Sequence, residues 1–161
     1  MNGFDSRWLA EREGAEASAP ESAGLDPLAA QAVAYVESLG AEPLLAVAYP
    51  GPFPSTNDYW SSPHWTKRNA EAKAWKKRTP ACAPLPEAEY PVWAWGVGLF
   101  EKGSRRYDED GVAVAKKLTV DALVQEDVLV NDSMKYVSAG VTTCLRSESG
   151  RGFVLVLTKP L

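Results

Sequence analysis

The fold is decided by residues 90–124, which read YPVWAWGVGLFEKGSRRYDEDGVAVAKKLTVDALV. Residues 90–100 are rich in valine and aromatic side chains, a composition that predicts a strand. A Lys-Gly-Ser turn follows, and residues 112–124 then place apolar side chains at helical spacing. The stretch therefore predicts a strand that leads through an acidic turn into an amphipathic helix.

The flanking sequence supplies further elements of both kinds. Apolar runs predict three more strands, at residues 44–49, 134–145 and 152–157, and residues 65–78 predict a helix that Pro80 ends. Residues 57–64 are polar and aromatic and are expected to form a loop. Because a short polar turn joins the last two strands, we expect them to pair as an antiparallel hairpin. The order of elements predicts an α+β domain with a small mixed sheet.

The N-terminal quarter of the chain differs in charge from the rest. Residues 1–42 carry eight acids and two bases, a net charge of -6, whereas residues 43–161 have a net charge of +2. Residues 11–24 contain almost no large apolar side chains and are expected to form a linker. Asp26 as N-cap and Pro27 predict a short helix after it, outside the main domain. We therefore expect an acidic extension at 1–42 and one main domain at 43–161.

Composition excludes several classes of protein. With 45% hydrophobic and 24% charged residues, the chain has the make-up of a globular domain. Its longest apolar runs are far shorter than the roughly 20 residues of a membrane-spanning helix, and its first residues lack the pattern of a secretory signal. These features predict a cytoplasmic protein with no membrane contact, in which Cys82 and Cys144 are reduced thiols. The sequence contains neither a glycine-rich phosphate loop nor a dinucleotide-binding motif. We therefore expect no organic cofactor.

Acidic side chains concentrate where the predicted elements end. Asp108 and Asp110 would point to one side if their segment is extended, and Lys117 and Asp121 are one helical turn apart. If Asp132 folds back from the next turn, all five side chains could share one surface. Hard oxygen ligands of this kind suit Mg²⁺. The alternative is that the acids are helix caps and that the Lys-Asp pair is an ordinary surface pair.

Basic side chains gather on the predicted helix at 65–78. Six bases and one acid between residues 67 and 78 give it a net charge of +5, and two tryptophans lie among them. Such a helix is either a surface that follows DNA phosphates or a solvated helix whose tryptophans belong to the core. The candidate DNA-binding residues are Asn57, Lys67, Arg68, Lys73, Lys76, Lys77, Arg105 and Arg106.

In their order along the chain, these features resemble the RusA-like Holliday junction resolvases of phages and prophages. The resemblance covers most of residues 43–158. The family pattern is a proline-rich loop with an Asn and an aromatic residue, a basic helix, and a strand that runs into an Arg-rich Asp-x-Asp-Asn turn. A helix with a Lys four residues before Asp-x-Leu comes next, and then an Asp-Asp pair before a strand. In this chain the matching segments are Pro52 to Trp60 with Asn57, Lys67 to Arg78, Arg105 to Asp110, Lys117 to Leu123, and Asn131-Asp132-Ser133.

The resemblance implies a small homodimer that hydrolyses phosphodiester bonds in two opposed strands of a four-way DNA junction. It implies that Asp108, Asp110 and Asp132 bind Mg²⁺, for which Mn²⁺ could substitute, and that Lys117 is the catalytic lysine. Asp121 would be a further metal ligand or would contact one. DNA recombination and repair are the processes that such an endonuclease serves.

The chain departs from the family pattern at two positions. Gly111 stands where the family usually has Asn, and Asn131 stands where the first of two paired acids is expected. Either Lys116 or Lys117 could be the catalytic lysine, and the spacing to Asp121 favours Lys117. Two alternative functions therefore stay open: a junction-binding module without catalysis, and a protein-interaction module that docks a partner through the acidic extension and the helix after Asp26.

Overall fold

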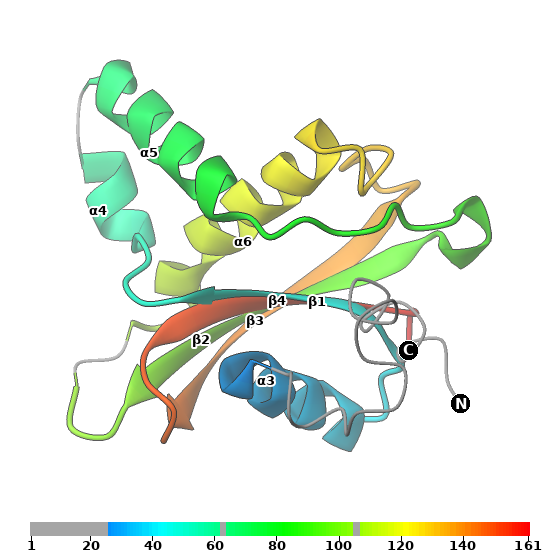
Figure 1. Cartoon of the computed structure of the whole chain (residues 1–161), viewed down its shortest axis with the longest axis horizontal. Helices are drawn as coiled ribbons and strands as arrows, with labels where there is room; N and C mark the ends of the chain where they lie inside the picture. The colour runs from blue at the N-terminus through cyan, green and yellow to red at the C-terminus, as the bar shows by residue number, and fades with distance from the viewer. Residues whose placement is uncertain (1–25, 62–63, 105–106) are drawn as a thin grey trace.

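The computed structural model describes residues 26–61, 64–104 and 107–161, which form an α+β fold around a four-stranded mixed sheet. The strands are β1 (Pro43–Pro50), β2 (Val92–Glu101), β3 (Val137–Ser147) and β4 (Gly152–Thr158). They lie in the order β1-β4-β2-β3. In Figure 1, helix α3 (Pro27–Ser38) covers one face of the sheet, and α4 (Thr56–Ser61), α5 (Trp65–Arg78) and α6 (Glu109–Gln125) lie on the other.

The expected hairpin between the last two strands does not form. β4 pairs antiparallel with both β1 and β2, whereas β3 pairs parallel with β2 and lies at the edge of the sheet. The physical reason is that β2 and β4 are the most apolar strands, buried along nearly their whole length, and two such strands belong at the centre of the sheet. β2 therefore lies between β3 and β4.

Helix α3 begins as the sequence predicts but packs differently. The Asp26 carboxylate accepts hydrogen bonds from the backbone N–H groups of Leu28 and Ala29 at 2.8 and 3.3 Å, and Pro27 occupies the first turn. The helix was expected outside the main domain. Instead its apolar side chains share a core with Trp95 and Val156 of the sheet. The face that a separate helix would offer to a partner is thus covered by the sheet.

Helix α6 packs closely on the centre of the sheet because β2 carries glycines beneath it. A side chain at Gly98 would come within 2.9 Å of Val112, and one at Gly96 would come within 3.0 Å of Lys116. The Lys116 side chain lies across these strands and reaches Gly140 of β3. Its partial burial lowers the pKa of its ammonium group from the ordinary 10.5.

Helix α5 occupies the predicted residues and is anchored through one tryptophan. Trp75 is buried, donates a hydrogen bond from its indole nitrogen to Thr119 of α6 at 2.9 Å, and stacks on Tyr49 of β1 at 4.1 Å between ring centroids. Arg78 lies over the Trp75 ring and donates to the backbone oxygens of Pro50 and Pro52. Trp75 is thus a core residue, as one of the two interpretations of this helix predicted.

Residues 56–61 are a short helix rather than the loop expected there. The Ser55 hydroxyl accepts a hydrogen bond from the backbone N–H of Asp58, which supports the first turn. The Thr56 hydroxyl donates to the backbone oxygen of Asp110 and accepts from the backbone N–H of Val114. Helix α4 is therefore fixed to the first turns of α6.

Candidate nucleic-acid interface and acidic site

Helix α6 begins one turn earlier than expected, and this changes the geometry of its acids. Asp108 is the N-cap, and its Oδ1 accepts a hydrogen bond from the backbone N–H of Gly111 at 2.7 Å. Asp110 lies in the first turn of the helix rather than in extended chain. The two carboxylates therefore do not point to one side as a strand would place them. The helix-cap interpretation of Asp108 is confirmed, and both side chains remain exposed to solvent.

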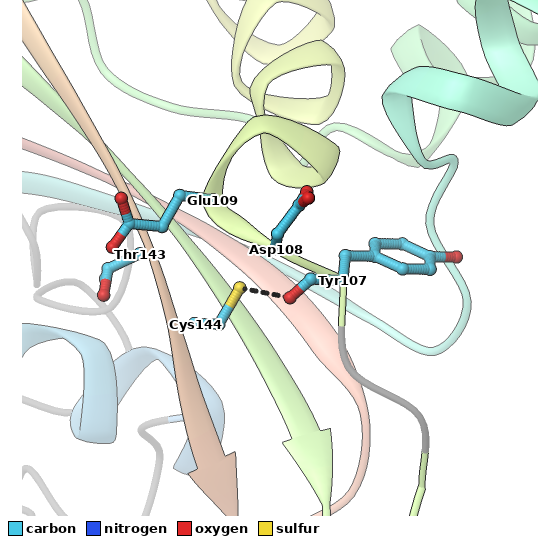
Figure 2. Close-up of a pocket in the computed structure, with 5 residues that line it drawn as sticks. All are labelled: Tyr107, Asp108, Glu109, Thr143 and Cys144. Carbon is cyan, nitrogen blue, oxygen red and sulfur yellow. Dashed lines mark hydrogen bonds between the residues drawn. The ribbon is translucent and has the colours of Figure 1, made fainter.

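An open pocket lies beside this helix start. It is lined by Tyr107, Asp108 and Glu109 from the α6 end and by Thr143 and Cys144 from β3. Figure 2 shows the Glu109 side chain extending toward Thr143, while the Asp108 carboxylate turns back to the first turn of its helix. The Cys144 thiol donates a hydrogen bond to the backbone oxygen of Tyr107 at 3.0 Å. Glu109 was not singled out in the sequence because only the actual helix start directs it toward β3.

Arg151 is a second residue that the sequence did not single out. Its guanidinium lies 5.0–5.5 Å from the ring centroids of Tyr107, Phe53 and Phe100, and it donates a hydrogen bond to the Tyr107 hydroxyl at 2.7 Å. That hydroxyl donates to the backbone oxygen of Phe53. Arg151 thus ties the acidic turn to the proline-rich loop. No sequence signal marks it, because the three rings come from three separate segments.

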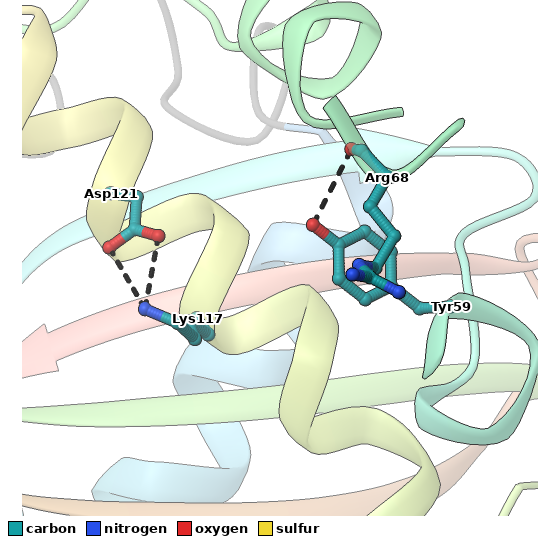
Figure 3. Close-up of polar contacts among 4 residues, drawn as sticks. All are labelled: Tyr59, Arg68, Lys117 and Asp121. Carbon is teal, nitrogen blue, oxygen red and sulfur yellow. Dashed lines mark hydrogen bonds and ion pairs between the residues drawn. The ribbon is translucent and has the colours of Figure 1, made fainter. Parts of the chain in front are cut away.

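Two polar pairs lie on the helices α4, α5 and α6. Lys117 and Asp121 form an ion pair of 3.2 Å, with side chains 61% and 37% exposed. Figure 3 shows this pair on α6 and, apart from it, a second pair in which the Tyr59 hydroxyl of α4 donates to the Arg68 backbone oxygen of α5 at 3.4 Å. Burial raises the pKa of the Tyr59 hydroxyl above 10.0, and the charges of Arg68, Glu71, Asp121 and Lys117 act on it more weakly.

Asp110 lies on the side of α6 that carries Lys117 and Asp121. Residues seven and eleven positions apart in a helix project from nearly the same side. The contacts of Thr56 with Asp110 and Val114 place α4 against this side. The sequence-based grouping of Asp110, Lys117 and Asp121 is therefore the grouping that the helix produces.

Asp132 does not join that group within one chain. It follows the C-terminal end of α6, whereas Asp108 and Asp110 lie at the N-terminal end. The 17 residues of α6 span about 24 Å. Asn131 and Ser133 form a turn around Asp132, in which the Asn131 side chain accepts from the Ser133 backbone N–H at 2.8 Å. The expectation that Asp132 folds back onto Asp108 is wrong because a straight helix separates them.

The described segments contain no group of three or more His, Cys, Asp or Glu side chains arranged to hold a metal ion. Asp108 and Asp110 by themselves offer carboxylate oxygens of the kind that Mg²⁺ takes together with water. Among the described residues of one copy, no third carboxylate joins Asp108 and Asp110 in such a group. Cys82 and Cys144 are free thiols.

Some of the candidate DNA-contacting residues and their basic neighbours are exposed, and others are held by contacts within the protein. Lys67, Lys73 and Lys77 are exposed on α5, and Asn57 is exposed on α4. Lys76 forms an ion pair with Glu126 at 3.7 Å. Arg78 is held by the backbone of the proline-rich loop. Arg105 and Arg106, two further candidates for DNA contact, lie outside the described residues.

No protein-family model matches the chain, and no curated protein matches it. No helix within residues 26–61, 64–104 and 107–161 is both long and apolar enough to cross a membrane.

Proposed function

We propose that this protein is a magnesium-dependent, structure-selective endodeoxyribonuclease that cuts four-way DNA junctions as a homodimer. One observation carries the proposal: the basic helix α5 packs against the acid-bearing helix α6, where the Trp75 indole of α5 donates a hydrogen bond to Thr119 of α6. A DNA strand that follows the lysines of α5 would thus be led to the side of α6 that carries Asp110. Binding groups and hydrolytic groups adjoin each other, as phosphodiester cleavage requires.

The DNA-binding part of the proposal rests on three exposed lysines. Lys67, Lys73 and Lys77 have no carboxylate within ion-pair distance among the described residues. Their ammonium groups are available to phosphates, and binding of this kind releases counterions and weakens steeply with salt. The net charge of -6 in residues 1–42 would oppose such binding by competing for the basic helix.

The hydrolytic part rests on two carboxylates and one lysine. Asp108 and Asp110 would hold Mg²⁺, or Mn²⁺ in its place, and the bound ion would supply an activated water and neutralise charge on the phosphate. Lys117 would stabilise the negative charge that develops on the phosphate. Asp121 holds the Lys117 ammonium in place at 3.2 Å. Lys116 is the weaker candidate, because its side chain lies across the sheet toward Gly140.

A third carboxylate can come from a second copy of the chain. Two copies related by a two-fold axis would run their α6 helices in opposite directions, so that the partner's Asp132 approaches Asp108 and Asp110. Two features support a contact on this side. Among the described strands β3 lies at the edge of the sheet and has no charged residue from Val137 to Leu145, and an edge of this kind favours pairing with another strand. Val130 and Met134, which flank the Asp132 turn, are exposed apolar side chains.

One alternative is a module that binds junctions without cutting them. It is favoured by the Asp108 side chain, which already caps α6, and by the separation of Asp132 from the other acids. The protein-interaction alternative has less support, because the apolar face of α3 is buried against the sheet.

Binding and cutting of one substrate separate these functions. A labelled four-way junction is incubated with the protein first in EDTA, to measure binding, and then in Mg²⁺, to measure cutting. The nuclease binds in EDTA and cuts after Mg²⁺ is added. A binding module gives the same complex in both buffers and intact DNA. Absence of any complex would contradict both and favour the interaction module.

A further inference from the structure

Two tryptophans on α4 and α5 are exposed to solvent. The side chain of Trp60 in α4 is 55% exposed and that of Trp65, the first residue of α5, is 66% exposed. Tryptophan is on average a well-buried residue, and Trp75 in the same helix is 2% exposed. Trp60 and Trp65 therefore contribute little to the core, and large exposed aromatic surface on a folded protein commonly marks a binding site.

Basic and aromatic side chains support these tryptophans. The Arg68 guanidinium lies 5.3 Å from the Trp60 ring centroid, and the Tyr59 ring meets Trp60 edge-on at 5.0 Å. Arg68 follows Trp65 by three residues in α5, so the two side chains are neighbours on the helix surface. Lys67 is exposed in the same turn. We call Trp60, Trp65, Lys67 and Arg68 the tryptophan platform.

The platform lies on the two helices, α4 and α5, that are hydrogen-bonded to α6. The rings of Tyr59 and Trp60 form a T-shaped pair, and the Tyr59 hydroxyl donates a hydrogen bond to the Arg68 backbone oxygen. Because Thr56 fixes α4 to Asp110 and Val114 of α6, a nucleotide on the platform would lie beside the helix that carries the proposed hydrolytic residues.

We propose that the tryptophan platform binds unstacked DNA bases at a branch point by stacking them on Trp60 and Trp65, with Lys67 and Arg68 at the adjoining phosphates. This inference rests on the proposed function, since it takes branched DNA as the ligand. Flat aromatic rings beside cations are the combination that holds single-stranded nucleic acid. In linear duplex the bases stack on each other and offer no free face, whereas bases at a branch are less constrained.

The chemistry of the platform favours DNA over a protein partner. Lysine is depleted in the cores of protein interfaces, yet Lys67 lies in the platform and Lys73 and Lys77 continue the exposed charge along α5. A row of lysines matches the spaced charges of a phosphate backbone. The platform would therefore supply preference for branched over linear DNA, a property that the lysines alone cannot provide.

The test measures affinity of the full-length chain for three DNAs in EDTA: a four-way junction, a single strand, and a linear duplex of the same sequence. The variants are Trp60→Ala, Trp65→Ala and their phenylalanine counterparts. Leu39→Ala, which truncates an exposed apolar side chain at the end of α3, is the matched control. We expect each alanine variant to lose at least about fivefold in affinity for the junction and the single strand, with linear duplex binding unchanged. Phenylalanine should restore part of the loss.

Equal affinities of wild type and alanine variants for the junction would overturn the platform, as would an equal loss on linear duplex. Far-ultraviolet circular dichroism and the urea midpoint of each variant exclude unfolding as the cause of a loss. The outcomes also separate the two proposals. A wild-type protein that cuts junctions while the alanine variants bind them normally would contradict the platform alone. A wild-type protein that binds none of the three DNAs would contradict the proposed function, and the platform with it.

Discussion

Lys117 and Asp121 form an ion pair on the surface of α6, with 3.2 Å between Nζ and Oδ2. An exposed pair of this kind contributes only about 0.3–0.5 kcal/mol to stability. The pair has a different importance for the proposed function, because the same side of α6 carries Asp110. The pair therefore allows function and stability to be tested separately.

Lys117→Met should abolish junction cutting and leave the free energy of unfolding within about 0.5 kcal/mol of wild type. The physical reason is that the ammonium group would stabilise charge on the phosphate but is poorly buried. Cleavage rates and urea denaturation measure the two effects. Lys116→Met serves as the comparison, and full loss of cutting in Lys116→Met with normal cutting in Lys117→Met would reverse the assignment.

A mixture of two inactive variants should regain cutting if the acids of one site come from two copies. Asp110→Asn and Asp132→Asn would each be inactive alone. In a mixed dimer, one of the two sites would combine an intact Asp108 and Asp110 with the partner's intact Asp132. We expect this mixture to nick one strand of the junction. Nicking by the mixture at no more than the level of either variant alone would contradict a site shared between copies.

Removal of exposed lysines on α5 should weaken DNA binding in a salt-dependent way. If Lys73 and Lys77 each contact one phosphate, the slope of log affinity against log salt should fall by about 0.9 for each alanine substitution. Lys159→Ala is the control, because Lys159 is exposed but pairs with Glu42 at 3.3 Å, beyond the end of β4. If Lys73→Ala and Lys159→Ala change the slope of log affinity against log salt equally, α5 is not the DNA-binding helix.

Trp75→Ala should destabilise the fold by about 3–5 kcal/mol. The substitution removes a buried ring that stacks on Tyr49 and leaves the buried Thr119 hydroxyl without its indole partner. Trp65→Ala, at the exposed start of the same helix, should change stability by less than about 0.5 kcal/mol. Urea denaturation compares them, and similar losses in the two variants would contradict the packing of α5 through Trp75.

The half-buried Lys116 should make stability depend on pH in the alkaline range. Because its pKa is lowered in the folded state, the unfolded chain binds more protons between the folded pKa and 10.5. Stability relative to Lys116→Met should therefore rise with pH through this window. Urea denaturation of both proteins from about pH 8 to about pH 10.5 measures the difference. A difference that stays constant with pH would show that Lys116 titrates as an exposed lysine.

Local sequence signals predicted most of the elements. The helix at 65–78 and the Asp26 cap were predicted as they occur, because caps, prolines and helical spacing act over a few residues. Strand order could not be obtained in this way. The short turn after β3 suggested a hairpin, but burial of both faces of β2 and β4 places these two strands together at the centre.

The sequence also predicted part of the candidate site, because helical spacing is a local property of the chain. Asp110, Lys117 and Asp121 share one side of α6 because helical spacing alone determines it. Asp132 was misplaced because its position depends on where α6 ends and on the length of the helix. Arg151 and the exposure of Trp60 and Trp65 depend on contacts between distant segments, which no local pattern encodes.

The most direct test of the account is cutting of a labelled four-way junction by the purified protein, with a linear duplex of the same sequence beside it. Reactions are run with and without Mg²⁺ for wild type, Asp110→Asn and the control Asp127→Asn, an exposed acid just beyond the other end of α6. We predict paired nicks in the junction with Mg²⁺ for wild type and Asp127→Asn, and none for Asp110→Asn or for the duplex. An intact junction with wild-type protein and Mg²⁺, or equal cutting by Asp110→Asn, would contradict the account.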